Sequence, residues 1–496
     1  MLLESILLVA AAAVTGACVE ECLTSYNVPF SVESSPDYNN LTKPYNLRLW
    51  YKPAVVVIPD NDKVEEQLHA AMRCASMCGT KVQAKSGGHS YASFSSGGRN
   101  GSMVVDLQNL QDINVGGEGT VTAGAGVRIG TLAAAVYARG KRGLAHGTCP
   151  GIGVGGHFTH GGFGYQSRAW GLALDHIYAL DVVLSNGSMV HATPDKYPEV
   201  YYAMRGAADS FGIVTKFWLN TIQAPPSVID FAFEFAGLYG SAENLADGFL
   251  HVQDFVRNST VVDSNLGFGM YLDGQVLLLR GSYFGDLDHF NSVIAAELLR
   301  GLPTPSTSMV NKHTYLESLE LLAGGSLSVP AHGYDLHDNF FAKSITVPEH
   351  APLTRENLVS YFSYIIAKGV NPPAPWFSIL NLYGGPGSKI NAKDLDFAAY
   401  SDRKSLWVFQ HYVFKEENQT ALPQEGMDFI TGLSQAVTQN RTDFGAYLNY
   451  VDPSLSAEEA YQLYYGQELY DRLVEIKRLV DPYNLFWNPQ TIVGFP

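Results

Sequence analysis

A histidine in a glycine-rich loop is the first feature of this sequence that could do chemistry. The segment 85–91 reads Lys-Ser-Gly-Gly-His-Ser-Tyr and follows a predicted strand. Glycine tolerates backbone conformations that turn amide groups toward an anion, so the loop resembles a pyrophosphate site, although taken alone such a composition more often forms an ordinary turn. The residues predicted to bind a pyrophosphate-containing cofactor here are Ser86, Gly87, Gly88, His89 and Ser90.

A second glycine-rich tract, 147–175, surrounds a cysteine that stands apart from the other four. So many glycines indicate a backbone pressed against a large planar ligand. The residues of this tract predicted to contact the ligand are Gly147, Thr148, Cys149, Gly151, Ile152, Gly153, Gly156 and His157.

The same tract contains a formal G-x-G-x-x-G, with Asp175 following at about twenty residues, which on paper is the dinucleotide fingerprint. We reject that interpretation because no apolar strand leads into Gly151 and the Cys149-Pro150 pair resists the required turn. No clean helix is predicted after Gly156 either.

Two other interpretations of these loops are weaker. His157 and His160 lie three residues apart, but no carboxylate or third histidine stands at ligand spacing, so we predict structural histidines and no metal. Cys149 as a hydrolase nucleophile lacks any local signature of such enzymes.

The remaining cysteines form two pairs at helical i, i+4 spacing, Cys18 with Cys22 and Cys74 with Cys78. Four cysteines can close two bridges in three ways, and a zinc site is the competing interpretation. An oxidising compartment would favour disulfides.

Three further motifs complete the pattern. Residues 204–215 contain Met-Arg-Gly and Phe-Gly-Ile-Val-Thr, residues 447–450 read Tyr-Leu-Asn-Tyr, and residues 481–490 begin with Asp-Pro-Tyr-Asn. Together with the two loops they resemble the berberine-bridge-enzyme-like branch of the vanillyl-alcohol oxidase superfamily, and within it the fungal oligosaccharide oxidases. The resemblance covers nearly the whole mature chain. It implies an α+β fold with a PCMH-type FAD-binding domain and an antiparallel-sheet substrate domain flanked by helices.

The resemblance also implies how the cofactor is held. One FAD per chain would be bonded covalently, by His89 to the 8α-methyl carbon and by Cys149 to C6 of the flavin. Gly212, Ile213, Val214 and Asn488 match further cofactor-binding positions. The family pattern suggests a Cys22–Cys74 disulfide, which leaves Cys18 and Cys78 to pair.

For catalysis, the resemblance assigns Tyr450 as the base that takes the substrate hydroxyl proton. An ordinary phenol is too weak a base at neutral pH, and where sugar oxidases place a helping aspartate this chain has Asn381. An amide can form hydrogen bonds but cannot accept the charge. The residues expected to face the substrate are Tyr91, Tyr271, Ile379 and Gln410, and Gly269 stands where an arginine is usual.

The leading hypothesis is therefore oxidation of an oligosaccharide at its anomeric C1 hydroxyl to a lactone, with O2 as the electron acceptor and H2O2 as its product. Several polar side chains that bind sugar hydroxyls in the family are replaced here, which favours a second hypothesis, a less polar alcohol or secondary metabolite as substrate. A catalytically silent flavin- or carbohydrate-binding protein is the third. In this family the position of Ile152 governs the approach of O2, and isoleucine accompanies dehydrogenases more often than valine does.

The elements that must position these residues follow from hydrophobic periodicity. Strands are predicted at 54–58, 81–84, 103–107, 179–184, 231–235 and 276–280, and helices at 64–78, 129–139, 353–367 and 457–479. The 496 residues exceed what one core usually serves. We predict an FAD-binding domain at 18–225, a substrate domain at 226–440 and a C-terminal segment, 441–496, that returns to the first domain.

Charge and targeting signals limit the partners. The net charge of -16, with no basic run, opposes binding to nucleic acid or to anionic membranes. Residues 1–17 are predicted to be a secretory signal peptide, although Glu4 stands where a basic residue is expected. Sequons for N-glycosylation occur at Asn40, Asn100, Asn186, Asn258, Asn418 and Asn440. A secreted monomer acting on a small molecule is the expectation.

Overall fold

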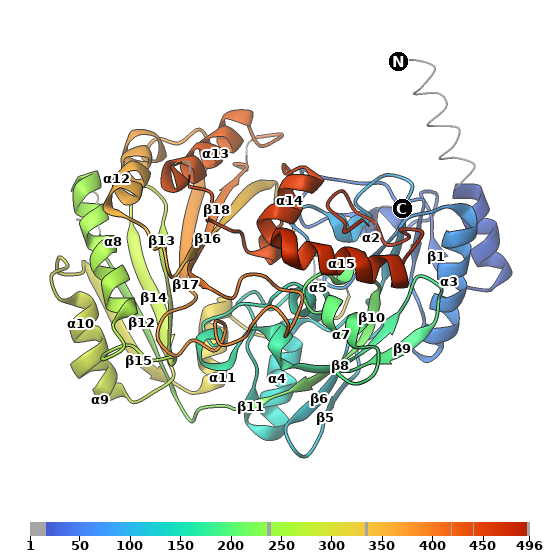
Figure 1. The fold of residues 1–496 in the computed structure, drawn as a ribbon, viewed down its shortest axis with the longest axis horizontal. Coiled ribbons are helices and arrows are strands. Elements are labelled where there is room, and N and C mark those ends of the chain that lie inside the picture. Colours follow the sequence, from blue (N-terminus) through green and yellow to red (C-terminus); the bar gives the residue numbers. More distant parts are fainter. Residues whose placement is uncertain (1–15, 236–239, 333–335, 418, 440, 494–496) are drawn as a thin grey trace.

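The computed structural model describes residues 16–235, 240–332, 336–417, 419–439 and 441–493 (Figure 1). Residues 1–15 of the predicted signal peptide lie outside this part of the chain, as do the sequon residues Asn418 and Asn440. The other sequon asparagines are exposed, namely Asn40, Asn100, Asn186 and Asn258. Within the described ranges, no helix combines the length and the apolar character needed to span a bilayer.

The first sheet carries the histidine loop at the end of one of its strands. Its strand order is β1 (Phe30–Ser31), β2 (Val55–Val57), β4 (Met103–Asp106), β3 (Val82–Lys85). The last three strands are parallel, and β2 and β4 are buried throughout, as expected for strands covered on both faces. The predictions at 54–58, 81–84 and 103–107 are confirmed to within about a residue, a normal tolerance for element ends.

An antiparallel sheet lies beside the first one. Its order is β5 (Ile113–Val115), β6 (Thr120–Gly124), β10 (Ile213–Asn220), β8 (Ile177–Val183), β9 (Met189–Ala192). A separate short pair joins β7 (Arg142–Gly143) to β11 (Ile222–Gln223). Helices of this region are α2 (Tyr38–Thr42), α3 (Val64–Cys78), α4 (Ile129–Gly140), α5 (Val154–Thr159), α6 (Ser167–Trp170) and α7 (Pro198–Ala203).

Helix α3 has the bounds that the sequence predicted. The residues at i, i+3, i+4 and i+7 of its inner face are all buried, namely Leu68, Ala71, Met72 and Ala75. The helix ends at Gly79, whose φ of 67° is the left-handed conformation that favours glycine at this position.

Two disulfides fasten α3 to the helical segment 16–25. They join Cys22 to Cys74 and Cys18 to Cys78, with Cα–Cα distances of 5.6 Å and 5.8 Å. The predicted pairing is confirmed, and the zinc alternative is excluded because all four thiols are consumed. The remaining cysteine, Cys149, is free.

The third sheet has seven antiparallel strands. Their order is β15 (Thr307–His313), β12 (Val228–Glu234), β14 (Leu277–Tyr283), β13 (Leu266–Leu272), β17 (Trp376–Leu382), β18 (Ser405–Phe414), β16 (Phe340–Pro348). Helices around it are α8 (Ala242–Arg257), α9 (Leu287–His289), α10 (Ala296–Leu299), α11 (Tyr315–Ala323), α12 (Arg355–Tyr364) and α13 (Gln424–Thr438). Helix α12 packs between α8 and α13 (Figure 1). The expected antiparallel sheet with flanking helices is confirmed.

The C-terminal helical pattern is broken into two helices, which corrects the prediction of one helix at 457–479. Helix α14 covers Ala457–Tyr464 and α15 covers Gly466–Val480. The break falls at Gly466, whose φ is 69°, so the backbone takes a left-handed turn that interrupts a right-handed helix. Both helices lie beside the N-terminal elements (Figure 1).

Two large hydrophobic cores divide the molecule. One holds residues between 19 and 219 together with 446–492, and the other holds residues between 229 and 437. The segment 383–400 and Val408 depart from this division, because residues there belong to the first core although they lie within the predicted substrate domain. The division of the chain at 225 and 440 stays a prediction.

Two buried arginines tie the two halves together. Arg168 of α6 donates to the carbonyl of Gly384 at 2.7 Å and to that of Asp263 at 2.8 Å, and its guanidinium also contacts the carbonyls of Leu266 and Pro386. Burial lowers the pKa of Arg168 to about 10, so it remains a cation at neutral pH. Every one of these acceptors lies on the substrate side of residue 226.

The second arginine, Arg403, accounts for the role of Asp175, the acid at the end of the formal dinucleotide fingerprint. Both carboxylate oxygens of Asp175 accept from Arg403, at 2.7 Å and 3.0 Å, in a bidentate ion pair. In a dinucleotide fingerprint this carboxylate would bind a ribose, but here both of its oxygens are bound to Arg403. One reason given for rejecting that fingerprint was wrong, because α5 does follow the glycines; the absence of a strand before Gly151 is confirmed.

Candidate active site

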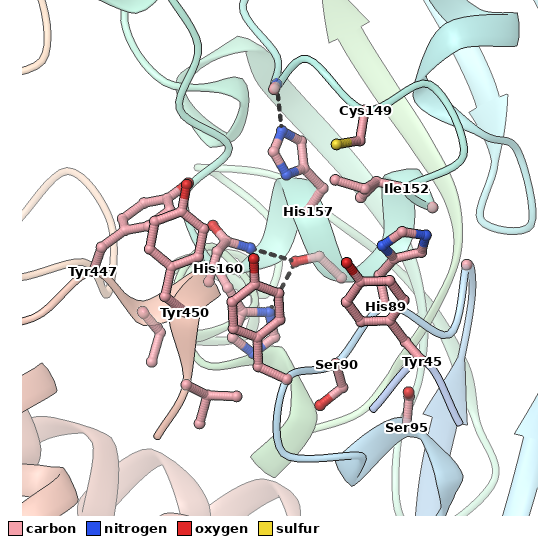
Figure 2. Close-up of a pocket in the computed structure, with 18 of the residues that line it drawn as sticks. Tyr45, His89, Ser90, Ser95, Cys149, Ile152, His157, His160, Tyr447 and Tyr450 are labelled. Carbon is pink, nitrogen blue, oxygen red and sulfur yellow. Dashed lines mark hydrogen bonds between the residues drawn. The ribbon is translucent and has the colours of Figure 1, made fainter. Parts of the chain in front are cut away.

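A cavity of about 670 Å³ collects most of the predicted site residues, from segments on both sides of residue 226. Its volume lies in the range expected for a ligand or cofactor site. The predicted residues that line it are Ser86, Gly87, Gly88, His89, Ser90, Tyr91, Gly147, Thr148, Cys149, Ile152, Gly153, Gly156, His157, Ile379, Asn381, Gln410, Tyr450 and Asn488. Figure 2 shows Cys149 and Ile152 on the side of this cavity where His89 lies.

Five predicted site residues do not line the cavity, namely Gly151, Gly212, Ile213, Val214 and Tyr271. Gly212 and the start of β10 are buried against β8, where a side chain at Gly212 would overlap Val182 and the carbonyl of Val183. Tyr271 pairs with Ile379 across β13 and β17 and stacks on Phe377 at 5.8 Å, outside the cavity lining. Their assigned contacts stay predictions that the cavity does not support.

The two glycine-rich loops touch each other, and glycine is what allows it. A Cβ on Gly87 would overlap the backbone of Gly153, so neither position admits a side chain. Arg128, a residue that sequence reasoning missed, donates to the carbonyls of Gly87 and Gly151 at 2.7 Å each. Ser86 adds a third link, because its hydroxyl accepts from the Gly155 amide at 3.1 Å.

The cavity fits a large cofactor at the backbone of this second loop. Gly156 lines the cavity, and a Cβ built on it would meet no protein atom within 4 Å, so its backbone faces open space. The Gly88 backbone on the facing loop has a φ of 72°, the left-handed conformation found in backbone concavities whose amides bind anions. Residues that would hold a flavin nucleotide are therefore present on both loops.

His89 is held in a stack of rings and is uncharged. Its imidazole lies 4.3 Å from the ring of Tyr45, with 20° between the planes. Burial lowers the pKa of His89 to about 3, and the positive charge of Arg128 adds to the effect. A neutral imidazole keeps a lone pair on one ring nitrogen, which a nucleophile requires.

The other two histidines of the loops have structural partners. The Gly147 amide donates to Nε2 of His157 at 2.9 Å, and burial lowers the pKa of His157 to about 3. His160 lies 3.5 Å from Asp209; burial lowers its pKa, but the hydrogen bond and charge of Asp209 outweigh burial and raise it. Among the described residues, no group of three or more His, Cys, Asp or Glu could hold a metal ion.

Tyr450 lies in the short 3-10 helix Leu448–Tyr450 and reaches the cavity between two other tyrosines (Figure 2). Its ring stacks on Tyr91 at 5.4 Å and meets Tyr447 edge-on at 4.9 Å. The hydroxyl of Tyr447 accepts from the amides of Gly162 and Phe163, at 3.0 Å and 2.8 Å, which anchors this motif on the glycine tract.

Tyr450 and Asn381, the residue that stands where sugar oxidases place a helping aspartate, do not contact each other through a recorded hydrogen bond. Both side chains line the same cavity, and no side-chain hydrogen bond is recorded for either one among the described residues. Burial raises the pKa of Tyr450, and a negative charge on Cys149 would raise it further, so its phenol is protonated at neutral pH. Asn381 lies opposite Gly269, and a Cβ there would press on its side-chain oxygen.

The wall opposite the glycine loops is mostly aromatic, and sequence reasoning missed most of it. Phe377, Tyr412 and Phe414 line the cavity beside Ile379 and Gln410. The signal was present, because side chains on a strand face one side at every second residue, and the register of β17 and β18 pairs Ile379 with Gln410 and Phe377 with Tyr412.

The polar groups on this wall are engaged with each other. Gln410 donates to the hydroxyl of Tyr91 at 2.7 Å, and the hydroxyl of Tyr412 donates to Asp338 at 2.7 Å. A substrate hydroxyl would have to replace or extend these hydrogen bonds. Asp338 is a second residue that no motif indicated.

Comparison with known proteins identifies the family. The FAD binding domain family matches residues 53–193, and the family described as berberine and berberine like matches residues 446–493. A xylooligosaccharide oxidase of Thermothelomyces thermophilus is 34% identical over 485 residues, which cover 96% of this chain and 94% of that protein. The chain belongs to the berberine-bridge-like oxidoreductases. It is therefore an FAD-dependent enzyme of the type that acts on CH–OH donors.

Solved structures of other berberine-bridge-like oxidoreductases share the whole fold. A xylooligosaccharide oxidase from Myceliophthora thermophila C1, in complex with xylobiose, has a TM-score of 0.89 at 32% identity, covering 97% of this chain and all of that one. A glucooligosaccharide oxidase from Acremonium strictum, titled for its 6-S-cysteinyl, 8α-N1-histidyl FAD, has a TM-score of 0.89 at 28% identity, covering 96% and 99%. The expected PCMH-type fold is confirmed.

Proposed function

We propose that this berberine-bridge-like oxidoreductase oxidises the anomeric C1 hydroxyl of an oligosaccharide to a lactone, with O2 reduced to H2O2. The observation that carries the proposal is the convergence of His89, Cys149 and Tyr450 on one cavity. Similar proteins of known activity that cover nearly the whole chain include xylo- and glucooligosaccharide oxidases. The lactone then takes up water to give the aldonic acid.

We propose that the FAD is attached by two bonds, from His89 to C8α and from Cys149 to C6. Each bond replaces one hydrogen on the flavin and one on the side chain, so each attachment leaves two electrons and two protons, which O2 accepts to give H2O2. The structure supports this with a neutral imidazole and a free thiol on the wall of one cavity. When bound, FAD supplies a two-electron acceptor for the carbinol hydrogen.

The side chains contribute binding and proton transfer. Tyr450 would take the hydroxyl proton of the substrate, and Tyr91 stacked on it keeps its ring in one orientation. Asn381 can donate or accept a hydrogen bond near the reacting hydroxyl but cannot store a proton.

A second candidate substrate, a less polar alcohol or secondary metabolite, is favoured by one specific observation. The cavity wall opposite the glycine loops presents Phe377, Phe414 and Ile379. The hydroxyls of Tyr91 and Tyr412 in this cavity already form hydrogen bonds with Gln410 and Asp338. A site that leaves substrate hydroxyls unpaired discriminates against them, because a buried unpaired polar group is costly.

An anaerobic screen separates these candidates. Bleaching of the flavin absorbance would be followed after adding cello-, xylo- or chito-oligosaccharides in one series and allylic or benzylic alcohols in another. We expect reduction by at least one oligosaccharide series, with the aldonic acid as product. Reduction by the alcohols alone would select the second candidate, and no reduction by either would indicate a silent flavoprotein.

Ile152 gives a prediction about oxygen. It lines the cavity three residues beyond Cys149, and isoleucine adds one methylene relative to valine. Packed walls leave few gaps to absorb such a group. We therefore expect Ile152→Val to reoxidise faster with O2 in stopped-flow mixing, while reduction by substrate stays unchanged. A reoxidation rate at or below that of the wild type would remove this role from Ile152.

We also propose that the protein is secreted and glycosylated. Two disulfides at the N-terminal segment require an oxidising compartment, and four sequon asparagines are exposed to solvent. Secretion by a fungal host, followed by mass measurement before and after enzymatic deglycosylation, would check both statements.

A further inference from the structure

Tyr45 lies at the junction of the two halves of the molecule and packs on the histidine that we propose to carry the flavin. Its ring stacks on His89 at 4.3 Å and 20°, and on Tyr91 at 6.1 Å and 24°. Figure 2 shows the Tyr45 ring beside the imidazole, on the cavity wall. No other ring contact of His89 is recorded among the described residues.

The stack matters because an imidazole is poorly fixed by its own torsions. The outer torsion of a histidine side chain is broad, whereas a bond from one ring nitrogen to a carbon atom requires one orientation of the ring plane. A parallel ring at stacking distance restricts that plane. The hydrogen bonds of the loop do not restrict the plane of the His89 ring, because they hold the backbone at Gly87.

Tyr45 is itself held from the substrate side. Its carbonyl accepts from the Asp338 amide at 2.9 Å, and the ring nitrogen Nδ1 of His337 lies 2.7 Å from the carbonyl of Pro44. The strand partner of this segment is residue 338, bridged to Asn46. The orientation of His89 is thus linked to contacts that exist only when both halves are folded together.

We propose that Tyr45 is a positioning residue for flavin attachment at His89: its ring holds the imidazole in the plane that bond formation needs. This inference rests on the proposed attachment and adds a residue to it. It concerns the rate of bond formation and leaves binding of FAD to the two glycine loops unaffected.

The test uses the full chain carrying Cys149→Ala, so that His89 is the sole attachment point. Protein made under riboflavin starvation is mixed with saturating FAD in air, and acid-stable flavin is followed with time by mass spectrometry of the His89 peptide. Adding Tyr45→Ala should slow attachment about 3- to 10-fold, the size expected for one lost aromatic pair. Adding Tyr45→Phe should leave the rate close to that of the parent, because the ring remains.

Controls separate this role from general damage. Phe414→Ala opens the same aromatic wall without touching His89 and should not slow attachment. Tyr45→Leu keeps apolar volume in case alanine impairs folding, and it should be slow as well. Binding of FAD before attachment, measured by fluorescence quenching, should be unchanged in every variant.

Three outcomes would overturn the proposal. One is attachment in both Tyr45→Ala and Tyr45→Leu at the parent rate. Another is a Tyr45→Phe variant as slow as Tyr45→Ala, which would assign the effect to the hydroxyl. The third is an equal slowing by Phe414→Ala. Failure of the proposed attachment itself looks different, because the Cys149→Ala parent would then hold no acid-stable flavin at all.

Discussion

Protein precipitated in acid is expected to stay yellow, and only the double variant His89→Ala/Cys149→Ala is expected to lose its colour to the supernatant. Acid unfolds the chain and releases flavin held by contacts alone, whereas a covalent bond survives. Each single variant should retain one attachment, because the two side chains reach the cavity from separate loops. Absorbance of the washed pellet and the mass of flavin-bearing peptides provide the measurement.

A matched control comes from the same cavity. His160 lines it and is paired with Asp209, so His160→Ala should keep both bonds. A colourless pellet from wild-type protein made in a flavin-replete host would refute the attachment. A yellow pellet from the double variant would show a third attachment point.

The second expected result is a loss of about 10²- to 10⁴-fold in the rate of flavin reduction when Tyr450 is replaced by phenylalanine, the usual cost of removing a general base. Covalent flavin should remain. Stopped-flow reduction under anaerobic conditions measures the rate. An unchanged rate would make Tyr450 a packing residue.

The pH dependence gives a second readout for Tyr450. Burial raises the pKa of its phenol, so the deprotonated form is the minor one at neutral pH and grows about tenfold with each pH unit. Wild-type reduction should therefore rise as the pH increases toward the alkaline range. The Tyr450→Phe variant should lack this rise.

Two neighbouring substitutions sharpen the assignment. Asn381→Asp introduces a carboxylate that can take up a proton, so reduction near neutral pH should be faster than in the wild type. Tyr165→Phe removes a phenol that lines the same cavity outside the motif and should change the rate little. A large loss in Tyr165→Phe would indicate that proton transfer uses a different tyrosine.

The loop chemistry was predictable from sequence, because it depends on residue types that few other environments require. Gly87 and Gly153 are glycines because their backbones touch, and this constraint is visible as a local composition. The period of α3 was equally visible, since its inner face repeats over four turns. Both features depend on residues that are close together in the chain, so a single sequence is enough to predict them.

What escaped prediction depends on contacts between distant segments. The Tyr45 ring meets His89 only after the 44–47 segment pairs with residue 338. The break at Gly466 escaped because isolated glycines are tolerated in helices, and the left-handed turn depends on how α14 and α15 pack. The Asp175 pair with Arg403 spans residues that no local pattern connects.

The aromatic wall is a different case, because the alternation of side chains along a strand is enough to indicate it. Once Ile379 and Gln410 are placed on neighbouring strands, the alternation of side chains requires Phe377 and Tyr412 to share their face. Strand bounds alone would have been enough to find them.

The guanidinium of Arg168 limits how this enzyme can be re-engineered by exchanging its parts. Recombining the flavin-binding half of one homologue with the substrate half of another is an obvious route to new specificity. Here the incoming half must present the carbonyls of Asp263, Gly384 and Pro386 to a cation that it does not itself carry. A chimera that displaced these carbonyls would leave a buried charge without partners, which costs several kcal/mol, roughly 3–5. Crossover points that move residue 168 together with 263–266 and 384–386 should therefore yield soluble hybrids more often than a cut at the apparent domain boundary.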